Sequence, residues 1–360
     1  MQDSKKIHGI SIISSEVKSM THHERIALLF AGKPADRPGF WIGNPHQDLS
    51  QRLFTRLGVD TEEALRRAVG DDVRWYPANW CAAYRHPNDR PIFDMTYNLA
   101  MQRPGTANAF ATCDDPADVE KYPWPDAAYY DLTPLRATAE AGSGCWRYGG
   151  AWCSFFHEVA DLFNMENYFM KMYTDPEVVH AVTRRVVDFY LALNQRVFTE
   201  ARDTLDAFFF GNDFGTQEAL LISPEKFQEF ILPYFTELIA QAKSYGLPVQ
   251  LHSCGAIAEV IPWLIDAGID ALHPLQAKAR GMDAETLARE YKDDLVFVGG
   301  VDTQDLMWRG TPQQIIDEVD RLHGIFGERW IVSPSHEVLL PEVPVENAIA
   351  LCEAATGLTL

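Results

Sequence analysis

The stretch Leu247-Pro-Val-Gln-Leu-His-Ser-Cys-Gly255 is the strongest indicator of both the fold and the chemistry of this chain. Its first residues are apolar enough to form a buried strand, and Gly255 then allows the backbone to turn into a helix. His252 and Cys254 stand at the carboxyl end of that strand. In parallel α/β proteins, ligands bind at this edge of the sheet. The stretch therefore predicts a functional site that uses an imidazole and a thiol.

Short apolar runs like this one recur along the chain and are typical of strands buried on both faces. They are too short for helices and too continuously apolar for strands with one solvated face. The predicted strands cover residues 39–42, 145–152, 207–210, 249–251, 271–272, 295–298 and 330–332. From residue 205 onward, strand, loop and helix alternate five times. This alternation predicts parallel strands joined by right-handed crossovers.

We expect a (β/α)8 TIM barrel, because the 360-residue length fits and about seven to eight strands can be counted. A doubly wound open sheet is the alternative, but no Gly-x-Gly-x-x-Gly motif follows a strand. Residues 1–19 are expected to form a flexible N-terminal extension, and residues 20–360 a single barrel domain. Residues 70–140 are rich in Pro, Asp and Tyr, which predicts long loops and short hairpins that decorate the N-terminal region.

Three helices have recognisable beginnings. Thr21 and Glu24 form a capping-box pattern before an apolar run. Pro176 and Pro224 each follow a capping residue, at the first position of a predicted helix. The helix that begins at Pro176 should extend to about residue 201, by the period of its apolar positions. The helix that begins at Pro224 contains Pro233, which should kink it.

The composition excludes some classes of partner. A formal net charge of −20 argues against a nucleic acid or an anionic membrane as the partner. No run approaches the roughly 18 apolar residues that a membrane-spanning helix needs. The six cysteines lack the spacing of a disulfide framework, which is typical of a reducing compartment. Because the first residues also lack the pattern of a secretory signal, we expect a cytoplasmic protein.

If the predicted strands form a barrel, the polar residues near their carboxyl ends line one shared mouth. The candidate acid/base residues are Asp213, His157 and Asp302. The candidate substrate contacts are Trp41, Asn212, Gln217, His273, Gln276, Gln304 and Glu337. For Asp213, Gln217 and Asp302, capping of the following helix is an alternative role.

His252, Cys254 and His336 are the candidate metal ligands. Zinc binds thiolate, imidazole and carboxylate, and catalytic zinc sites keep three protein ligands and one open position. Glu337 or Asp213 could substitute for one ligand or support the others by hydrogen bonds. In the alternative interpretation, Cys254 is a small buried residue and His252 only hydrogen-bonds a substrate.

Motifs at several strand ends and helix starts form a recognisable set. They are Ala35-Asp-Arg-Pro38, Gly211-Asn-Asp-Phe-Gly-Thr-Gln217, Ser223-Pro-Glu-Lys-Phe227, Leu251-His-Ser-Cys-Gly255, Gly299-Gly-Val-Asp-Thr-Gln304, Ser333-Pro-Ser-His336 and Pro344-Val-Glu-Asn347. Together they resemble the superfamily of uroporphyrinogen decarboxylase and the related corrinoid-linked methyltransferases, from about residue 150 to residue 358 and more loosely before it. The resemblance implies a TIM barrel with its site in the mouth, often in a homodimer.

Two chemistries occur in that superfamily. The decarboxylase branch uses no metal and holds a polycarboxylated porphyrinogen with an arginine-rich stretch after the first strand. Here that stretch reads Trp41-Ile-Gly-Asn-Pro-His46, without arginine, so the carboxylates of such a substrate would lack partners. The chain is more similar to the methyltransferase branch, which binds zinc through a His-x-Cys pair and a later Cys. His252 and Cys254 match the pair, and His336 stands at the later position.

The first hypothesis is a zinc-dependent methyltransferase or demethylase that works with a corrinoid protein on a small methylated substrate. The corrinoid would be carried by a separate partner, since the chain has no evident cobalamin-binding module. The second hypothesis is a metal-free decarboxylase or lyase that acts on a small acid or a porphyrinogen, with Asp213 and His336 in acid/base roles. The third is a binding protein that has kept the barrel and lost the reaction.

Overall fold

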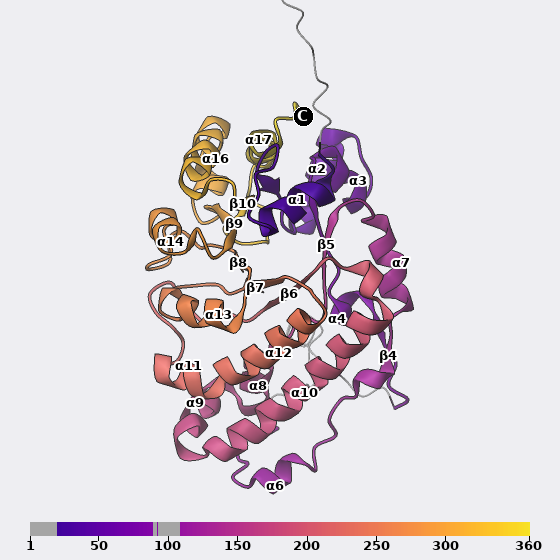
Figure 1. Cartoon of the computed structure of the whole chain (residues 1–360), viewed down its shortest axis with the longest axis vertical. Helices are drawn as coiled ribbons and strands as arrows, with labels where there is room; N and C mark the ends of the chain where they lie inside the picture. Colours follow the sequence, from indigo (N-terminus) through magenta and orange to yellow (C-terminus); the bar gives the residue numbers. More distant parts are fainter. Residues whose placement is uncertain (1–19, 89–91, 93–108) are drawn as a thin grey trace, which may run out of the picture.

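Eight parallel strands form a barrel in the middle of the molecule (Figure 1). The computed structural model describes residues 20–88, 92 and 109–360, so the expected extension over residues 1–19 lies outside the described residues. In chain order the strands are β1 (Gly39–Phe40), β2 (Val73–Trp75), β5 (Trp146–Gly149), β6 (Ala207–Gly211), β7 (Val249–His252), β8 (Ala271–His273), β9 (Val296–Val301) and β10 (Trp330–Pro334). Each strand from β2 to β10 pairs with the next one, and β10 pairs with β1. This order confirms the TIM barrel and excludes the doubly wound sheet, whose strand order reverses near its middle.

Residues just before β2 close the barrel between β1 and β2. The backbone N–H of Asp72 donates to the carbonyl of Phe40 at 2.9 Å, and the Asp72 carboxylate accepts the N–H of Phe40, also at 2.9 Å. This carboxylate is fully buried and lies 2.6 Å from Arg25 and 2.8 Å from Arg37. Because a buried charge is tolerated only when it is paired, the two arginines allow Asp72 to make the closing contact.

The apolar core has two parts, one inside the barrel and one between the barrel and its helices. Phe209 on β6 lies in the inner part, together with Trp41 and Tyr148. Its neighbours Phe208 and Phe210 lie in the outer part. Successive side chains of a strand point to opposite faces, so both faces of β6 are buried. This is the physical reason for the continuous apolar runs in the sequence.

Helices surround the barrel, and the N-terminal helices lie beside the C-terminal one (Figure 1). The α-helices are α1 (His22–Phe30), α2 (Gln47–Leu57), α3 (Glu62–Ala68), α4 (Ala78–Cys81), α6 (Pro116–Val119), α7 (Thr133–Ala141), α8 (Phe155–Phe163), α9 (Met165–Thr174), α10 (Pro176–Glu200), α11 (Pro224–Phe230), α12 (Leu232–Ser244), α13 (Ile261–Ala267), α14 (Ala284–Tyr291), α15 (Leu306–Arg309), α16 (Pro312–Phe326) and α17 (Val345–Thr356). Short 3-10 turns cover Ala127–Tyr129, Arg202–Thr204 and Ala258–Val260.

The three predicted helix starts are confirmed. Thr21 and Glu24 form the capping box of α1. Helix α10 runs from Pro176 to Glu200, close to the expected end. The helix predicted after Ser223 is divided into α11 and α12 at Ile231, and Pro233 stands in the first turn of α12. Pro233 therefore does break the helix, because proline has no backbone N–H to donate and its ring clashes with a carbonyl of the preceding turn.

The prediction of only loops and hairpins for residues 70–140 was wrong in part. A short antiparallel pair, β3 (Ala83–Tyr84) and β4 (Tyr130–Asp131), matches a hairpin-like decoration. However, β2 is a barrel strand that the sequence did not reveal. Its central residue, Arg74, is buried and pairs with Glu63 at 2.7 Å, so the strand lacks the continuous apolar pattern of the others.

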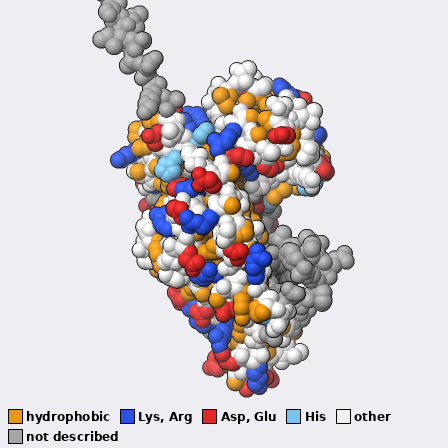
Figure 2. Space-filling view, turned by 90° about the vertical axis from the view of Figure 1, so that its right-hand side faces the viewer, with side chains coloured by type: hydrophobic (Ala, Val, Ile, Leu, Met, Phe, Trp, Pro, Cys, Tyr) orange, Lys and Arg blue, Asp and Glu red, His pale blue; other side chains and the backbone are white. Residues whose placement is uncertain are grey.

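Acidic and basic side chains are interspersed on the face shown in Figure 2. Many charges lie in pairs along or between helices, such as Arg184 with Asp188 at 2.9 Å and Arg321 with Glu318 at 2.7 Å. Among the described helices, none combines the length and the apolar composition that crossing a membrane requires.

Replacing Asp72 with alanine should lower the free energy of unfolding by about 3–5 kcal/mol, because it removes the carboxylate that Arg25 and Arg37 share at the closure. Urea denaturation followed by circular dichroism measures the change. Asp203→Ala is the control, since Asp203 pairs with Arg136 at the surface and its side chain is 67% exposed. That variant should change stability by less than about 1 kcal/mol. Equal losses in the two variants would contradict the role of Asp72 in closing the barrel.

Candidate active site

Three predicted site residues meet where β6 and β7 end. His252 is the last residue of β7, and its Nε2 lies 3.1 Å from Oδ1 of Asp213 and 3.4 Å from Sγ of Cys254. The same Oδ1 accepts the backbone N–H of Cys254 at 2.9 Å. A carboxylate, an imidazole and a thiol thus point to one small volume at the mouth of the barrel.

The loops after β6 and β7 are in direct backbone contact, which brings these side chains together. Gly215 N–H donates to the carbonyl of Cys254 at 3.3 Å, and Ala256 N–H donates to the carbonyl of Thr216 at 2.7 Å. Gly255 has a φ of +86°, and a Cβ at this position would lie only 2.1 Å from the carbonyl oxygen of Gly215. Glycine is therefore needed both for the turn and for the close approach of the two loops.

Charge coupling sets the ionisation of Asp213 and His252. Burial opposes the ionised form of Asp213, but the hydrogen bonds from His252 and Cys254 and the charge of His252 lower its pKa below the ordinary value. Burial likewise disfavours a charged His252, yet the nearby Glu337 and Asp213 carboxylates raise its pKa well above the ordinary value. Burial raises the pKa of the Cys254 thiol, and His252 partly opposes that shift. These shifts favour the ionised forms of both Asp213 and His252.

The second nitrogen of His252 faces the barrel interior. Its Nδ1 lies 2.9 Å from Nδ1 of His273 on β8 and 3.6 Å from Oε2 of Glu337. Burial and the charge of His252 lower the pKa of His273 well below the ordinary value. A neutral His273 can therefore accept the Nδ1–H of His252, which leaves Nε2 directed at Asp213 and Cys254.

His157 supports Asp213 from the opposite side. Its Nε2 accepts the backbone N–H of Asp213 at 2.9 Å, and burial lowers the pKa of this histidine. A neutral ring with Nε2 as the acceptor carries its proton on Nδ1. His157 thus orients the start of the loop after β6, and α8 carries it.

His336 stands apart from the three converging side chains. Its Nδ1 accepts the backbone N–H of Val338 at 3.0 Å, and its side chain is 39% exposed. Its ring lines the mouth near Glu337, whose Oε2 lies 3.8 Å away. In this arrangement Asp213, rather than His336, completes the group with His252 and Cys254.

Other candidate residues are engaged in backbone contacts. The Asp302 carboxylate accepts the N–H groups of Gln304, Asp305 and Leu306 at 3.0–3.2 Å and pairs with Lys278 at 2.9 Å, which is the capping arrangement that the sequence left open.

Asn212 and Trp41 are also enclosed by the protein. The amide of Asn212 accepts the N–H of Phe156 and donates to the carbonyl of Cys153, both at 2.9 Å. Trp41 is fully buried inside the barrel, 5.0 Å from the ring of His273. Trp41 is thus enclosed within the barrel, and the two backbone contacts hold the Asn212 side chain in place at the mouth.

A cavity of about 380 Å³ opens above the converging side chains. Asp213, His252, His336 and Glu337 lie in its wall. The sequence did not reveal the three tryptophans that also line it, Trp75, Trp80 and Trp152. Trp75 ends β2 and Trp152 follows β5, so the available signal was an aromatic residue at a strand's carboxyl end.

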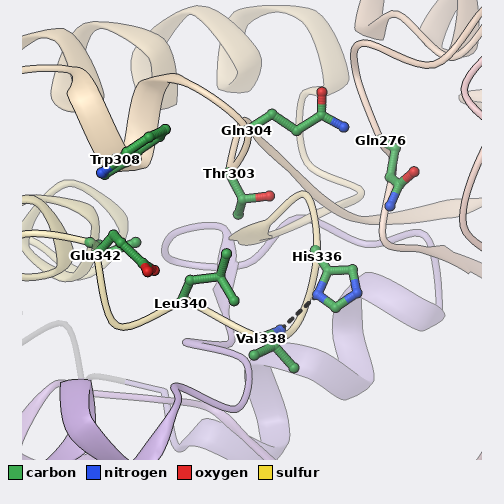
Figure 3. Close-up of a pocket in the computed structure, with 9 residues that line it drawn as sticks. Gln276, Thr303, Gln304, Trp308, His336, Val338, Leu340 and Glu342 are labelled. Atoms are coloured by element: carbon green, nitrogen blue, oxygen red, sulfur yellow. Dashed lines mark hydrogen bonds between the residues drawn. The ribbon is translucent and has the colours of Figure 1, made fainter.

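A second cavity, of about 560 Å³, adjoins the first and shares His336 and Val338 with it. Figure 3 shows Trp308, Leu340 and Val338 around it, with Gln304 and Gln276 toward the upper right of the view and Thr303 between them and Leu340. An amide chain links the loops of this side: Gln217 donates to Gln276 at 3.1 Å and accepts from Gln304 at 3.2 Å. The structure therefore places Gln217, Gln276 and Gln304 together, with Gln276 and Gln304 in the wall of the second cavity.

Asp213, His252 and Cys254 fit a zinc ion by donor type and spacing. Their donor atoms all lie within 4.8 Å of one another. Tetrahedral zinc with ordinary bond lengths separates its donors by roughly 3.3–3.8 Å, close to the 3.1 Å and 3.4 Å that separate Nε2 of His252 from Oδ1 of Asp213 and from Sγ of Cys254. His252, His273 and Glu337 form a second group of this kind, but His273 is completely buried. The first group contains the thiol, and none of its residues is buried as completely as His273, so it fits a catalytic zinc better.

Residues 107–358 match the family model of uroporphyrinogen decarboxylase (URO-D), and the chain belongs to this family. Within the superfamily it stands near the methyltransferase branch. It is 29% identical to a methylated-thiol–coenzyme M methyltransferase of Methanosarcina mazei over 147 residues, which are 39% of this chain and 35% of that protein.

Two further relatives represent both branches. A methylcobamide:CoM methyltransferase of Methanosarcina acetivorans is 22% identical over 44% of each chain. A uroporphyrinogen decarboxylase of Aliarcobacter butzleri is 25% identical over 49% of this chain and 48% of its own. The chain thus spans less than half the length of the relatives it matches.

A solved structure, described as a methyltransferase from Methanosarcina mazei, shares the fold. It superposes with a TM-score of 0.64 at 15% identity and covers 94% of this chain and 99% of its own. At that identity the likeness concerns the barrel alone.

Gly255→Ala should destabilise the protein more than Gly246→Ala. Both glycines have positive φ, which costs an alanine roughly 1–2 kcal/mol, but a Cβ at Gly246 meets no atom within 4 Å. The difference in the free energy of unfolding, measured in urea, therefore isolates the collision with Gly215. Equal losses in the two variants would contradict the need for close loop contact.

Proposed function

We propose that this protein is a zinc-dependent methyltransferase that moves a methyl group between a small substrate and a corrinoid carried by a separate protein. The observation that supports this most is the convergence of Asp213, His252 and Cys254 beside a cavity. The methyltransferase relatives and the family membership point in the same direction. We include a homodimer in the proposal, as the family resemblance implies.

Each residue has a defined part in this proposal. Nε2 of His252, Sγ of Cys254 and Oδ1 of Asp213 would hold zinc, which supplies Lewis acidity and lowers the pKa of a bound group. His273 would keep His252 in the right tautomer by accepting its Nδ1–H. His157 would orient Asp213, and His336 would contact the substrate from the cavity wall.

The metal-free decarboxylase is the second candidate, because one relative is a uroporphyrinogen decarboxylase. A substrate with carboxylates needs cationic partners when it leaves water. Among the described residues that line the two cavities there is no lysine or arginine. The methyltransferase is therefore the better supported of the two.

Metal analysis of the purified protein should find about one zinc per chain. Cys254→Ser and His252→Ala should lower zinc affinity at least tenfold, because each removes a ligand. Cys113→Ser is the control, since Cys113 is a half-buried thiol outside the site. Comparison of Asp213→Asn with His336→Ala identifies the third ligand, and we expect only Asp213→Asn to lose zinc. A wild-type protein that binds no zinc would contradict the proposal.

Incubation with a reduced corrinoid and a panel of methylated thioethers and amines should consume one of the methylated compounds, as measured by mass spectrometry. Chelation should abolish the reaction and added zinc should restore it, because the metal provides the Lewis acid. Cys254→Ser should lower the rate at least a hundredfold. Full activity after chelation, or release of CO₂ from an acid substrate instead, would favour the decarboxylase.

A further inference from the structure

We infer that the cavity beside Asp213 and His252 binds a methylated cation, a quaternary ammonium or sulfonium compound. Such a cation has no N–H group to donate, so proteins hold it with aromatic faces and nearby negative charge. The described lining of the cavity provides both features and lacks a competing lysine or arginine.

Three tryptophans form the aromatic wall. The rings of Trp80 and Trp152 each lie 5.0 Å from that of Trp75, and they lie 6.2 Å from each other. Trp152 is also 5.4 Å from the ring of His252, so the wall reaches the proposed metal ligands. Trp80 lines the cavity and is 47% exposed, so part of its ring remains open to a ligand.

Three carboxylates contribute to the rest of the wall. Asp213, Glu158 and Glu337 all line the cavity, and Glu342 lines the adjoining one. When zinc is bound, the charges of Asp213 and the Cys254 thiolate are neutralised by the metal. Glu337, whose carboxylate also lines the cavity, still contributes negative charge there. An anionic ligand would be repelled here, whereas a cation would gain from both the carboxylates and the ring faces.

The inference concerns binding, and the use of the bound cation as a methyl source rests on the proposed function. In that transfer the methyl carbon leaves nitrogen or sulfur, which keeps the bonding electron pair and becomes a neutral amine or thioether. The reduced corrinoid supplies the electron pair for the new bond to carbon. The charge of the substrate is thereby lost at the step that releases it from the aromatic wall.

Calorimetric titration with choline and with 3,3-dimethylbutan-1-ol tests the inference. The two probes have nearly the same shape, but only choline is charged. We expect choline to bind at least tenfold more tightly, and Trp80→Ala to reduce its affinity at least tenfold while Trp80→Phe retains most of it. Equal affinity for the two probes, or no binding of choline by the folded wild type, would overturn the inference.

Trp308→Ala is the matched control. Trp308 is 41% exposed in the adjoining cavity, and the guanidinium of Arg309 already lies 4.1 Å from its ring. Choline affinity should be unchanged in this variant, and an equal loss in Trp308→Ala and Trp80→Ala would overturn the placement of the ligand.

Titration of Cys254→Ser separates this inference from the proposed function. Choline binding by the zinc-free variant would support the cation site whether or not methyl transfer occurs. If the wild-type protein binds zinc and transfers methyl groups but does not bind choline, the cation site alone is overturned.

Discussion

The Asp213 carboxylate is the contact on which the site depends. One oxygen, Oδ1, accepts hydrogen bonds from the His252 ring and from the Cys254 backbone, so it joins the ends of β6 and β7. The N–H of Asp213 donates to His157, which adds α8 to the same network. Because Asp213 and His252 can carry opposite charges at the partly buried mouth of the barrel, each favours the ionised form of the other. A metal that displaces the proton on Nε2 would find its ligands already oriented.

The barrel is common to proteins with different chemistries, so the lining of its mouth has to decide the reaction. Here the described wall combines tryptophans and carboxylates without lysine or arginine. That combination disfavours substrates with several carboxylates, because such groups would lose water without gaining a partner. It is compatible with an apolar or cationic methyl compound. Charge thus separates the two candidate functions more clearly than sequence similarity, which covers less than half of each relative.

Most barrel strands could be predicted because each is apolar on both faces, a pattern visible within a few residues. Strand β2 was not predicted because Arg74 interrupts its apolar pattern. The buried charge of Arg74 is paired with Glu63, eleven positions earlier in the chain. The candidate site could be predicted from the sequence for a similar reason. His252 and Cys254 are close in sequence and follow a strand, so their meeting could be foreseen. The approach of Asp213 to His252 and Cys254, and the separation of His336 from them, depend on how loops that are distant in sequence approach each other.

The sequence by itself determined the order of most strands and helices, the barrel and the edge at which the candidate site is expected. These features follow from local periodicity, capping and turn residues, which act over a few positions. Only the tertiary structure decided the closure through Asp72, the convergence of Asp213 with His252 and Cys254, and the tryptophan wall. Each of these joins residues that are tens of positions apart. Their side-chain directions depend on packing and on the burial of charge, which no local pattern encodes.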